Sequence, residues 1–248
     1  MIGACFVAFR VNLSAKLVTV PEISLWRDLY REEMNCQIVH DSLSVRPGWT
    51  QPWLLEAEGV PVGYGSILIG GPWAGTRTVF EFYMLPKGRA RVFDLFAALL
   101  EASAATAINV QSNDTLLTVM LHAWAHNIVS EKIVFEDELT TAHAADGATL
   151  RPRGKLDNDW VLEVDGEVAG KGGILYHYNR PYGDICMEVA EPFRRRGLGC
   201  FRVQELKRIC YEEGSVPCAR CNPDNEASRM TLQKAGFIPC AHILTGSL

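Results

Sequence analysis

The sequence lacks any long hydrophobic run, and it has no excess of basic residues. No stretch approaches the ~18 apolar residues that span a bilayer, so we expect no membrane partner and no membrane-crossing helix. Lys and Arg number 24 against 29 Asp and Glu, which gives a net charge of −5. Duplex nucleic-acid binders need a basic footprint to displace counterions, so this charge balance argues against nucleic acid as a partner.

The chain also lacks the composition of a disordered or fibrous protein. Apolar residues make up 48% and charged residues 21% of its 248 residues, as in ordinary globular proteins. At ~150 residues per domain, that length predicts one large domain or two small ones. Residues 1–9 are apolar but have no preceding basic residue and no clear small-residue cleavage site. We therefore interpret them as a strand rather than a signal peptide.

No pattern of metal ligands is complete. Most of the eight cysteines lie inside apolar periodic segments, where free thiols behave as small hydrophobes, and this predicts a reducing, cytoplasmic setting. Cys218 and Cys221 form a single C-x-x-C on a predicted strand, where residues three apart point to opposite faces. His122 and His126 are four apart on a predicted helix but lack the Glu of H-E-x-x-H and a third ligand. We expect no metal.

Two stretches of the chain repeat each other at an offset of 107 residues. Residues 53–68 read WLLEAEGVPVGYGSIL and residues 160–175 read WVLEVDGEVAGKGGIL, with eight identities in sixteen positions. Roughly one identity is expected from average composition. Each copy is predicted to be a β-hairpin that turns at an acidic-Gly pair, Glu58-Gly59 or Asp165-Gly166.

The parallel continues downstream of both hairpins. Each copy is followed by a third strand (78–85; 184–189), a helix, a short strand (107–111; 217–221), an Asn (Asn113; Asn225) and another short helix. Residues 140–159, rich in Ala, Gly and Asp, are predicted to join the copies. We therefore predict an α/β protein of two domains, 1–140 and 141–248, each with a mixed, mostly antiparallel sheet flanked by helices.

An amphipathic helix is predicted at residues 21–34, ahead of the first copy. The second copy has no room for such a helix, so we expect it to lean on the first. The face of the helix predicted to pack in the core carries Leu25, Trp26, Leu29 and Tyr30.

The sharpest chemical feature is the segment VAEPFRRRGLGC at residues 189–200. A strand ends there, and R-x-x-G-x-G, formed by Arg194, Gly197 and Gly199, opens a long helix. The first amides of a helix have no intrahelical partner and the helix dipole favours negative charge, so this end suits an anion. Glycines let a bulky diphosphate approach the backbone. The simpler alternative is a tight turn with solvated arginines.

A second element follows at residues 222–237, NPDNEASRMTLQKAGF. With the loop before it, this segment resembles the GNAT superfamily of acyl-CoA-dependent N-acyltransferases, in which an Asn-x-x-Ala/Ser helix ends in Gly-Phe; the matching residues are Asn225, Ser228, Gly236 and Phe237. The resemblance spans residues 160–243, and the internal repeat extends it to the first half. It implies acetyl-CoA as cosubstrate, with its pyrophosphate on the amides of residues 195–200 and its pantetheine arm beside Met187, Val189 and Asn225. The residues assigned to this site are Met187, Val189, Arg194, Arg195, Arg196, Gly197, Leu198, Gly199, Cys200, Asn225 and Ser228.

The first half departs from this pattern. When Pro86 is aligned with Pro192, the positions of Arg194, Gly197 and Gly199 hold Gly88, Arg91 and Phe93. A phenylalanine where backbone must touch phosphate would block approach. We therefore expect the first half to bind no CoA and to complete the cleft and core of the second.

The acid and base of the reaction are not at the positions usual in the superfamily. The usual Tyr position holds Leu232 and the usual Glu position holds Gly183. Glu188 and His177 are the candidate catalytic residues, with water-relayed deprotonation and groups from the first half (Glu33, His40, Glu81) as alternatives.

The predicted function is transfer of an acetyl group from acetyl-CoA to a primary amine on a small molecule or peptide. The alternatives are a non-catalytic CoA-binding or interaction module and a purely structural scaffold. The oligomeric state has no signal in the sequence.

Overall fold

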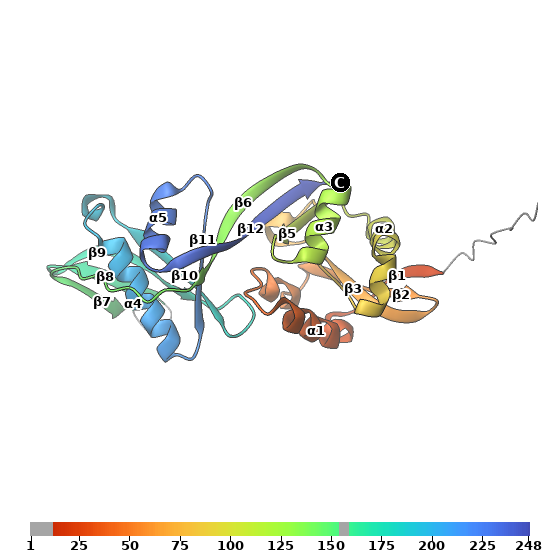
Figure 1. Cartoon of the computed structure of the whole chain (residues 1–248), viewed down its shortest axis with the longest axis horizontal. Helices are drawn as coiled ribbons and strands as arrows, with labels where there is room; N and C mark the ends of the chain where they lie inside the picture. Colours follow the sequence, from red (N-terminus) through yellow and green to blue (C-terminus); the bar gives the residue numbers. More distant parts are fainter. Residues whose placement is uncertain (1–11, 154–158) are drawn as a thin grey trace, which may run out of the picture.

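The computed structural model describes residues 12–153 and 159–248, so the strand expected at residues 1–9 lies outside the described residues. Helices and strands alternate along both halves (Figure 1). The helices are α1 (Ser24–Met34), α2 (Val92–Ser103), α3 (Thr115–Trp124), α4 (Leu198–Glu212) and α5 (Glu226–Lys234). The strands are β1 (Leu13–Leu17), β2 (Thr50–Ala57), β3 (Val60–Leu68), β4 (Thr78–Met84), β5 (Ala107–Gln111), β6 (His126–Asp137), β7 (Ala148–Pro152), β8 (Asp159–Val164), β9 (Glu167–Leu175), β10 (Tyr182–Val189), β11 (Val216–Cys221) and β12 (Phe237–Ser247).

The repeat predicted from the sequence is present in the fold. The order strand, strand, strand, helix, strand, helix holds for β2 to α3 and again for β8 to α5. Both hairpins turn at the predicted acidic-Gly pairs, where Glu58 and Asp165 have φ of 51° and the following glycines have φ of 72° and 85°. Two consecutive left-handed residues are the geometry of a tight hairpin turn. One predicted linker is partly wrong, because residues 140–159 contain β7, which pairs with β8 along its length.

All the described strands join in one sheet. Its order is β1-β2-β3-β4-β5-β12-β6-β11-β10-β9-β8-β7. Neighbouring strands are antiparallel except for β4 with β5 and β10 with β11. The fold is therefore mixed α/β with a mostly antiparallel sheet flanked by helices, as predicted.

The two halves exchange strands at the centre of this sheet. β12, from the end of the second half, pairs with β5 of the first half, while β6 pairs with β11 of the second. β6 and β12 also pair with each other over most of their length, and Figure 1 shows them running together between the two lobes. Each half thus completes the sheet of the other. The division at 140/141 stays a prediction.

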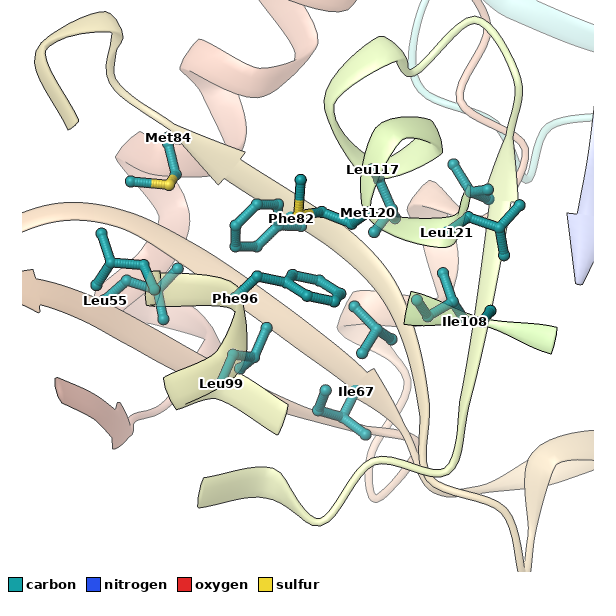
Figure 2. Packing of buried hydrophobic residues seen from close by; sticks show 14 of the residues in the cluster. Leu55, Ile67, Phe82, Met84, Phe96, Leu99, Ile108, Leu117, Met120 and Leu121 are labelled. Atoms are coloured by element: carbon teal, nitrogen blue, oxygen red, sulfur yellow. The ribbon is translucent and has the colours of Figure 1, made fainter. Parts of the chain in front are cut away.

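Two hydrophobic cores lie at either end of the sheet. In the first half, α2 and α3 pack against β2–β5, where Phe82 and Phe96 meet edge to face at a centroid distance of 4.9 Å (Figure 2). In the second half, α4 and α5 cover one face of β9–β11 with β6 and β12. Within the described part of the chain, no helix has both the length and the hydrophobicity to cross a membrane.

The predicted core face of α1 is partly wrong: Tyr30 is buried and Trp26 packs against the same cluster, but the two leucines do not. Leu25 and Leu29 are 75% and 39% exposed, and the buried side chains around this helix are Ile23, Arg27 and Tyr30. Arg27 belongs to the inner face because its guanidinium donates to the carboxylates of Glu81 at 2.9 Å and Asp41 at 2.8 Å. A hydrophobic pattern alone cannot identify a face that buries a paired charge.

Candidate active site

The second half opens where two parallel strands separate. β10 and β11 pair only through Tyr182, Gly183 and Asp184 of β10, and their final pair is Asp184 with Cys218. β10 then continues to Val189 and β11 to Cys221, so a gap widens beyond Asp184. A cleft of about 820 Å³ lies at this end of β10, between the start of α4 and α5. Its volume is within the usual range for ligand sites.

The loop from β10 to α4 presents backbone amides to the cleft. The first intrahelical bond of α4 runs from the Phe201 amide to the Gly197 carbonyl at 3.2 Å. The amides of Leu198, Gly199 and Cys200 precede that bond, and all three residues line the cleft. Unpaired amides and the positive end of the helix dipole make this an anion-binding end.

Two residues of the loop adopt left-handed backbone conformations. Arg195 has φ of 61° and Gly197, the residue before α4, has φ of 77°. A Cβ on Gly197 would meet no atom within 4 Å, so the space above its backbone is open. A Cβ on Gly199 would lie 3.1 Å from Thr231 Cγ2 and 3.6 Å from Met187 Cε. Gly197 is thus required because its φ is positive, and Gly199 because α5 comes close to its backbone.

Asn225 begins α5 as its N-cap. Its side-chain oxygen accepts a hydrogen bond from the Ser228 amide at 3.0 Å, which fixes the start of the helix. Because Oδ1 accepts the capping bond, Nδ2 of Asn225 is the side-chain atom that can donate to a ligand. Asn225 and Ser228 both line the cleft.

The cleft contains ten of the eleven residues assigned to the acyl-CoA site from the sequence. Arg196 is the exception, since its guanidinium lies over the Phe193 ring at 5.6 Å instead of lining the cleft. The Arg194 Nε donates to the Val189 carbonyl at 3.1 Å and so ties the loop back to the end of β10. The ten residues that line it are Met187, Val189, Arg194, Arg195, Gly197, Leu198, Gly199, Cys200, Asn225 and Ser228.

One wall of the cleft was not predicted from the sequence. Ala227, Met230, Thr231 and Lys234 of α5 also line it. Residues three and four apart lie on one face of a helix, so the periodicity of residues 226–234 could have predicted this wall. Lys234 adds a cation opposite the α4 end.

The two candidate catalytic residues lie in different places. Glu188 is exposed on β10 and lines the cleft. His177 follows the end of β9, and its Nε2 lies 3.3 Å from Asp184 Oδ2 and 3.1 Å from Arg220 Nη2. Among the described residues, no ion pair involves the carboxylate of Glu188, which is exposed. The positions usual for an acid and a base are filled by packing, because Leu232 is 3% exposed and Gly183 faces Cys210 of α4.

The corresponding opening of the first half is filled by α1. β4 and β5 pair only at Thr78 and Val79 before they separate. The Tyr30 ring lies 6.2 Å from the Tyr83 ring of β4, and its hydroxyl donates to Oδ2 of Asp114, after β5, at 2.9 Å. A cavity of about 10 Å³ remains beside it, enough for roughly one water. Asp114 caps α3 through the Leu117 amide, so Asp114, rather than Asn113, is the counterpart of Asn225.

The structure corrects one pair in the predicted alignment of the first-half loop with the second-half loop. The Arg89 Nε donates to the Met84 carbonyl at 3.1 Å, the same bond that Arg194 makes to Val189. Arg89, not Gly88, is therefore the counterpart of Arg194. Its guanidinium is engaged by Glu33 of α1 at 2.5 Å. Arg91 precedes α2 as Gly197 precedes α4, which leaves Phe93 opposite Gly199 as expected.

The residues of the two incomplete metal-ligand patterns are separated in the fold. Cys218 packs with Val39 and Tyr178 on one face of the sheet, while Cys221 packs under α4 and α5 on the other. His122 and His126 do not share a helix, because α3 ends at Trp124 and His126 begins β6. Over residues 12–153 and 159–248, no three His, Cys, Asp or Glu residues gather as a metal site.

Part of the chain matches a known family. Residues 124–237 match the model of the acetyltransferase (GNAT) family. This segment contains β6, the β10–β11 opening, the loop and α5. No curated protein matches the chain by sequence.

Solved structures share the fold of nearly the whole chain. A GNAT-family acetyltransferase from Colwellia psychrerythraea has a TM-score of 0.73 at 12% identity, over 95% of this chain and 99% of that one. A GCN5-related N-acetyltransferase from Sphaerobacter thermophilus has a TM-score of 0.63 at 15% identity, over 95% of each chain. A tandem GNAT protein from the clavulanic acid biosynthesis pathway has a TM-score of 0.64 at 15% identity, over 95% of this chain and 98% of that one.

Proposed function

We propose that this protein is a tandem GNAT N-acetyltransferase that transfers an acetyl group from acetyl-CoA to a primary amine of a small molecule or peptide. The observation that carries the proposal is the cleft at the β10–β11 opening, with the amides of Leu198, Gly199 and Cys200 on its wall. The first half is proposed to be a degenerate copy, because Tyr30 fills its opening and Phe93 stands opposite Gly199.

The residues of the cleft fit an acyl-CoA. The open space over Gly197 and the amides at the start of α4 suit a diphosphate, and Arg194, Arg195 and Lys234 add positive charge. Beyond Asp184, no described strand pairs with β10 on its β11 side, so the β10 backbone near Met187 can pair with the amides of a pantetheine arm beside the Val189 carbonyl, which accepts from Arg194.

Acetyl-CoA, when bound, supplies an acetyl group on a thioester, which a neutral amine attacks so that a carbon–nitrogen bond forms as the carbon–sulfur bond breaks. The chain must take one proton from the acceptor ammonium, and a proton must reach the leaving sulfur. We assign the first task to His177, whose imidazolium would be balanced by Asp184 at 3.3 Å. Glu188, on the wall of the cleft, is the alternative base.

Calorimetric titration with acetyl-CoA tests the proposal directly. We expect saturable binding at micromolar protein, and we expect Arg195→Glu to weaken it more than Arg196→Glu, because only Arg195 lines the cleft. The matched control is Arg151→Glu, an exposed arginine of β7 outside the cleft. A folded wild-type protein that gives no heat with acetyl-CoA would contradict the proposal.

A non-catalytic CoA-binding module is the second candidate. The observation that favours it is the loss of the usual acid and base, since Leu232 is packed in the core and Gly183 has no side chain. Release of free thiol from acetyl-CoA over a panel of primary amines separates the two candidates. Release above background hydrolysis with any amine supports the enzyme; binding without release with every amine supports the module.

The cytoplasmic location remains part of this proposal and rests on the sequence alone. Fractionation of the source cells, followed by immunodetection, tests it.

A further inference from the structure

We propose that Arg202 is a positioning residue of the acyl-CoA site: its buried guanidinium holds the start of α4 and the end of β10 in a fixed relation, so that one ligand can contact both. This role rests on the proposed function, in which a diphosphate lies on the amides at the start of α4 and a pantetheine arm lies along β10. Arg202 does not line the cleft and therefore acts through the backbone that does.

Arg202 is a charged residue inside the hydrophobic core of the second half. It lies on α4 one turn after Leu198, and it is 0% exposed. Val203 and Leu206 of the same helix are also buried and belong to that core. Burial lowers the pKa of Arg202 to about 10, so the guanidinium still carries its charge at neutral pH. A cation thus lies one turn behind the amides that line the cleft.

The guanidinium donates to two backbone carbonyls on different strands. Nη2 of Arg202 donates to the Trp160 carbonyl, near the start of β8, at 2.7 Å. Nη1 donates to the Glu188 carbonyl, near the end of β10, at 3.4 Å. Both acceptors are neutral, and within the described part of the chain the buried Nε has no hydrogen-bond partner. These bonds join α4 to β8 and β10 without cancelling the charge.

A glycine of β9 makes room for this link. The guanidinium lies against Gly170, where a Cβ would be 3.0 Å from Arg202 Nη1 and closer still to the Glu188 carbonyl oxygen. β9 lies between β8 and β10 in the sheet. Arg202 therefore reaches from α4 across β9, at a position that has no side chain, to the strands on either side of it.

The Glu188 end of the link orients the edge of β10 at the cleft. The Glu188 carbonyl lies against β9, and carbonyls alternate between the two edges along a strand, so those of Met187 and Val189 point to the opposite edge. The Val189 carbonyl accepts from Arg194 of the loop there, at 3.1 Å. The Met187 carbonyl is presented on the side where β11 has separated from β10. Arg202 thus fixes the strand edge that the pantetheine arm would use.

The first half has an apolar residue at the corresponding position. Because Phe93 stands opposite Gly199, Phe96 is the counterpart of Arg202, and it is fully buried as well. Phe96 packs edge to face on Phe82 of β4, in the half whose opening is filled by α1 (Figure 2). A phenylalanine therefore meets the packing requirement of this helix position. Of the two halves, it is the one with the cleft that has a charge there.

The energetics of a buried charge separate the two roles that Arg202 could have. Replacing a buried charge by an apolar side chain of similar volume is often neutral or stabilising. If Arg202 serves packing alone, such a substitution leaves ligand binding unchanged. If it positions the site, the substitution keeps stability and weakens binding.

Calorimetric titration with acetyl-CoA, combined with urea unfolding, measures this separation. We expect Arg202→Phe, which copies the first half, to keep the urea midpoint at or above that of wild type and to weaken acetyl-CoA binding by about tenfold. Arg202→Met, with an unbranched and flexible side chain, should do the same. The matched control is Arg208→Met, at a residue of the same helix whose side chain is 54% exposed, and we expect it to change neither quantity.

The conservative variant Arg202→Lys tests whether the hydrogen bonds matter. Lysine keeps the charge and can donate to a carbonyl, but it lacks the planar fork that reaches two strands. We expect its affinity for acetyl-CoA to lie between those of wild type and Arg202→Met. An affinity no higher than that of Arg202→Met would contradict a role through these bonds.

Amide hydrogen exchange of the ligand-free full chain tests the positioning without acetyl-CoA. We expect residues 186–200 to exchange about tenfold faster in Arg202→Met than in wild type, with the remainder of the second half unchanged. Because no ligand is present, this readout distinguishes failure of the positioning role from failure of the proposed function. If wild type binds no acetyl-CoA, faster exchange at an unchanged urea midpoint still supports the link, and unchanged exchange overturns it.

Two further results would overturn the proposal. The first is a folded Arg202→Met protein with wild-type affinity for acetyl-CoA. The second is a parallel loss of stability and affinity in both apolar variants, or failure of both to fold, which would show that Arg202 serves the fold alone. If Arg202→Phe alone fails to fold, Arg202→Met decides.

Discussion

Gly199 lies where α4 approaches α5, and a side chain at this position would block the cleft most directly. A Cβ there would lie 3.1 Å from Thr231 Cγ2, with Met187 next to it, so any larger side chain must turn into the cleft. Gly199→Phe reproduces the residue that the first half carries at Phe93.

We expect Gly199→Phe to weaken binding of acetyl-CoA by at least about 100-fold, roughly 2.7 kcal/mol, while the protein stays folded. Calorimetry measures the affinity and circular dichroism the fold. The control is Val60→Phe, at a residue of β3 that is 51% exposed. Affinity within a few-fold of wild type would place the ligand elsewhere.

Asp114 is a buried carboxyl in the filled opening of the first half. Burial raises its pKa to about 6, against which its bonds from Leu117 and Tyr30 act. An unfolded Asp titrates near 4, so between about pH 4 and pH 6 the folded state holds more protons than the unfolded state. Stability from this group is therefore present at low pH and falls as pH rises through that window.

Asp114→Asn removes this titration but keeps an N-cap. As the pH rises from 4 to 7, we expect the unfolding free energy of the variant to increase by about 3 kcal/mol relative to that of wild type. Urea unfolding at several pH values measures the difference. A difference between the two proteins that does not change with pH would contradict the raised pKa.

At the scale of elements, α1 is held by a buried ion pair. Glu81 of β4 is 1% exposed and accepts hydrogen bonds from Arg27, from Tyr64 Oη at 3.0 Å and from Ser44 Oγ at 3.1 Å. Removing Glu81 leaves the buried Arg27 charge with Asp41 as its one acidic partner and costs stability. The same helix supplies Tyr30, so its seat on β4 also keeps the first opening filled.

We expect Glu81→Ala to lower the unfolding free energy by about 3–5 kcal/mol. The matched control is Arg151→Ala, which breaks an exposed pair with Glu163 and should change it by less than about 1 kcal/mol. Denaturant unfolding measures both. Equal effects of the two substitutions would mean that Asp41 alone compensates the Arg27 charge, or that Arg27 reaches solvent.

Local elements were predictable because their signals are local. Short turn sequences specify their own geometry whatever they pack against, as in the turns at Glu58-Gly59 and Asp165-Gly166 and in the loop before α4. The place of Arg27 on the inner face of α1 was not predictable, because its burial depends on pairing with Asp41 and with Glu81, 54 residues away. The α5 wall of the cleft was readable from periodicity, whereas the bond from the Ser42 amide to the His177 carbonyl depends on the path of residues 36–45 across the other half.

At the scale of the whole molecule, the exchange of β6 and β12 makes the halves interdependent. β12 lies between β5 and β6, and β6 lies between β12 and β11. Strand exchange is a long-range pairing with no signal in either strand alone, so the repeat in the sequence revealed two units but not how they join.

We expect fragments 1–140 and 141–248, each expressed alone, to be unfolded or aggregated, because each would expose an unpaired strand edge at its centre. Expressed together, they should associate and recover the circular dichroism of the full chain. Size-exclusion chromatography measures the association. A fragment that is monomeric and unfolds cooperatively alone would show that the predicted boundary at 140/141 separates independent domains.

The position of β12 also bears on how the molecule forms during translation. Every other described strand leaves the ribosome before β12 does, yet β12 occupies an interior row of the sheet. Until residues 237–247 emerge, β5 retains an unpaired edge. The sheet of the first half therefore cannot be completed before the end of the second half has been synthesised. Nascent chains should therefore stay vulnerable to proteases and dependent on chaperones until β12 has emerged.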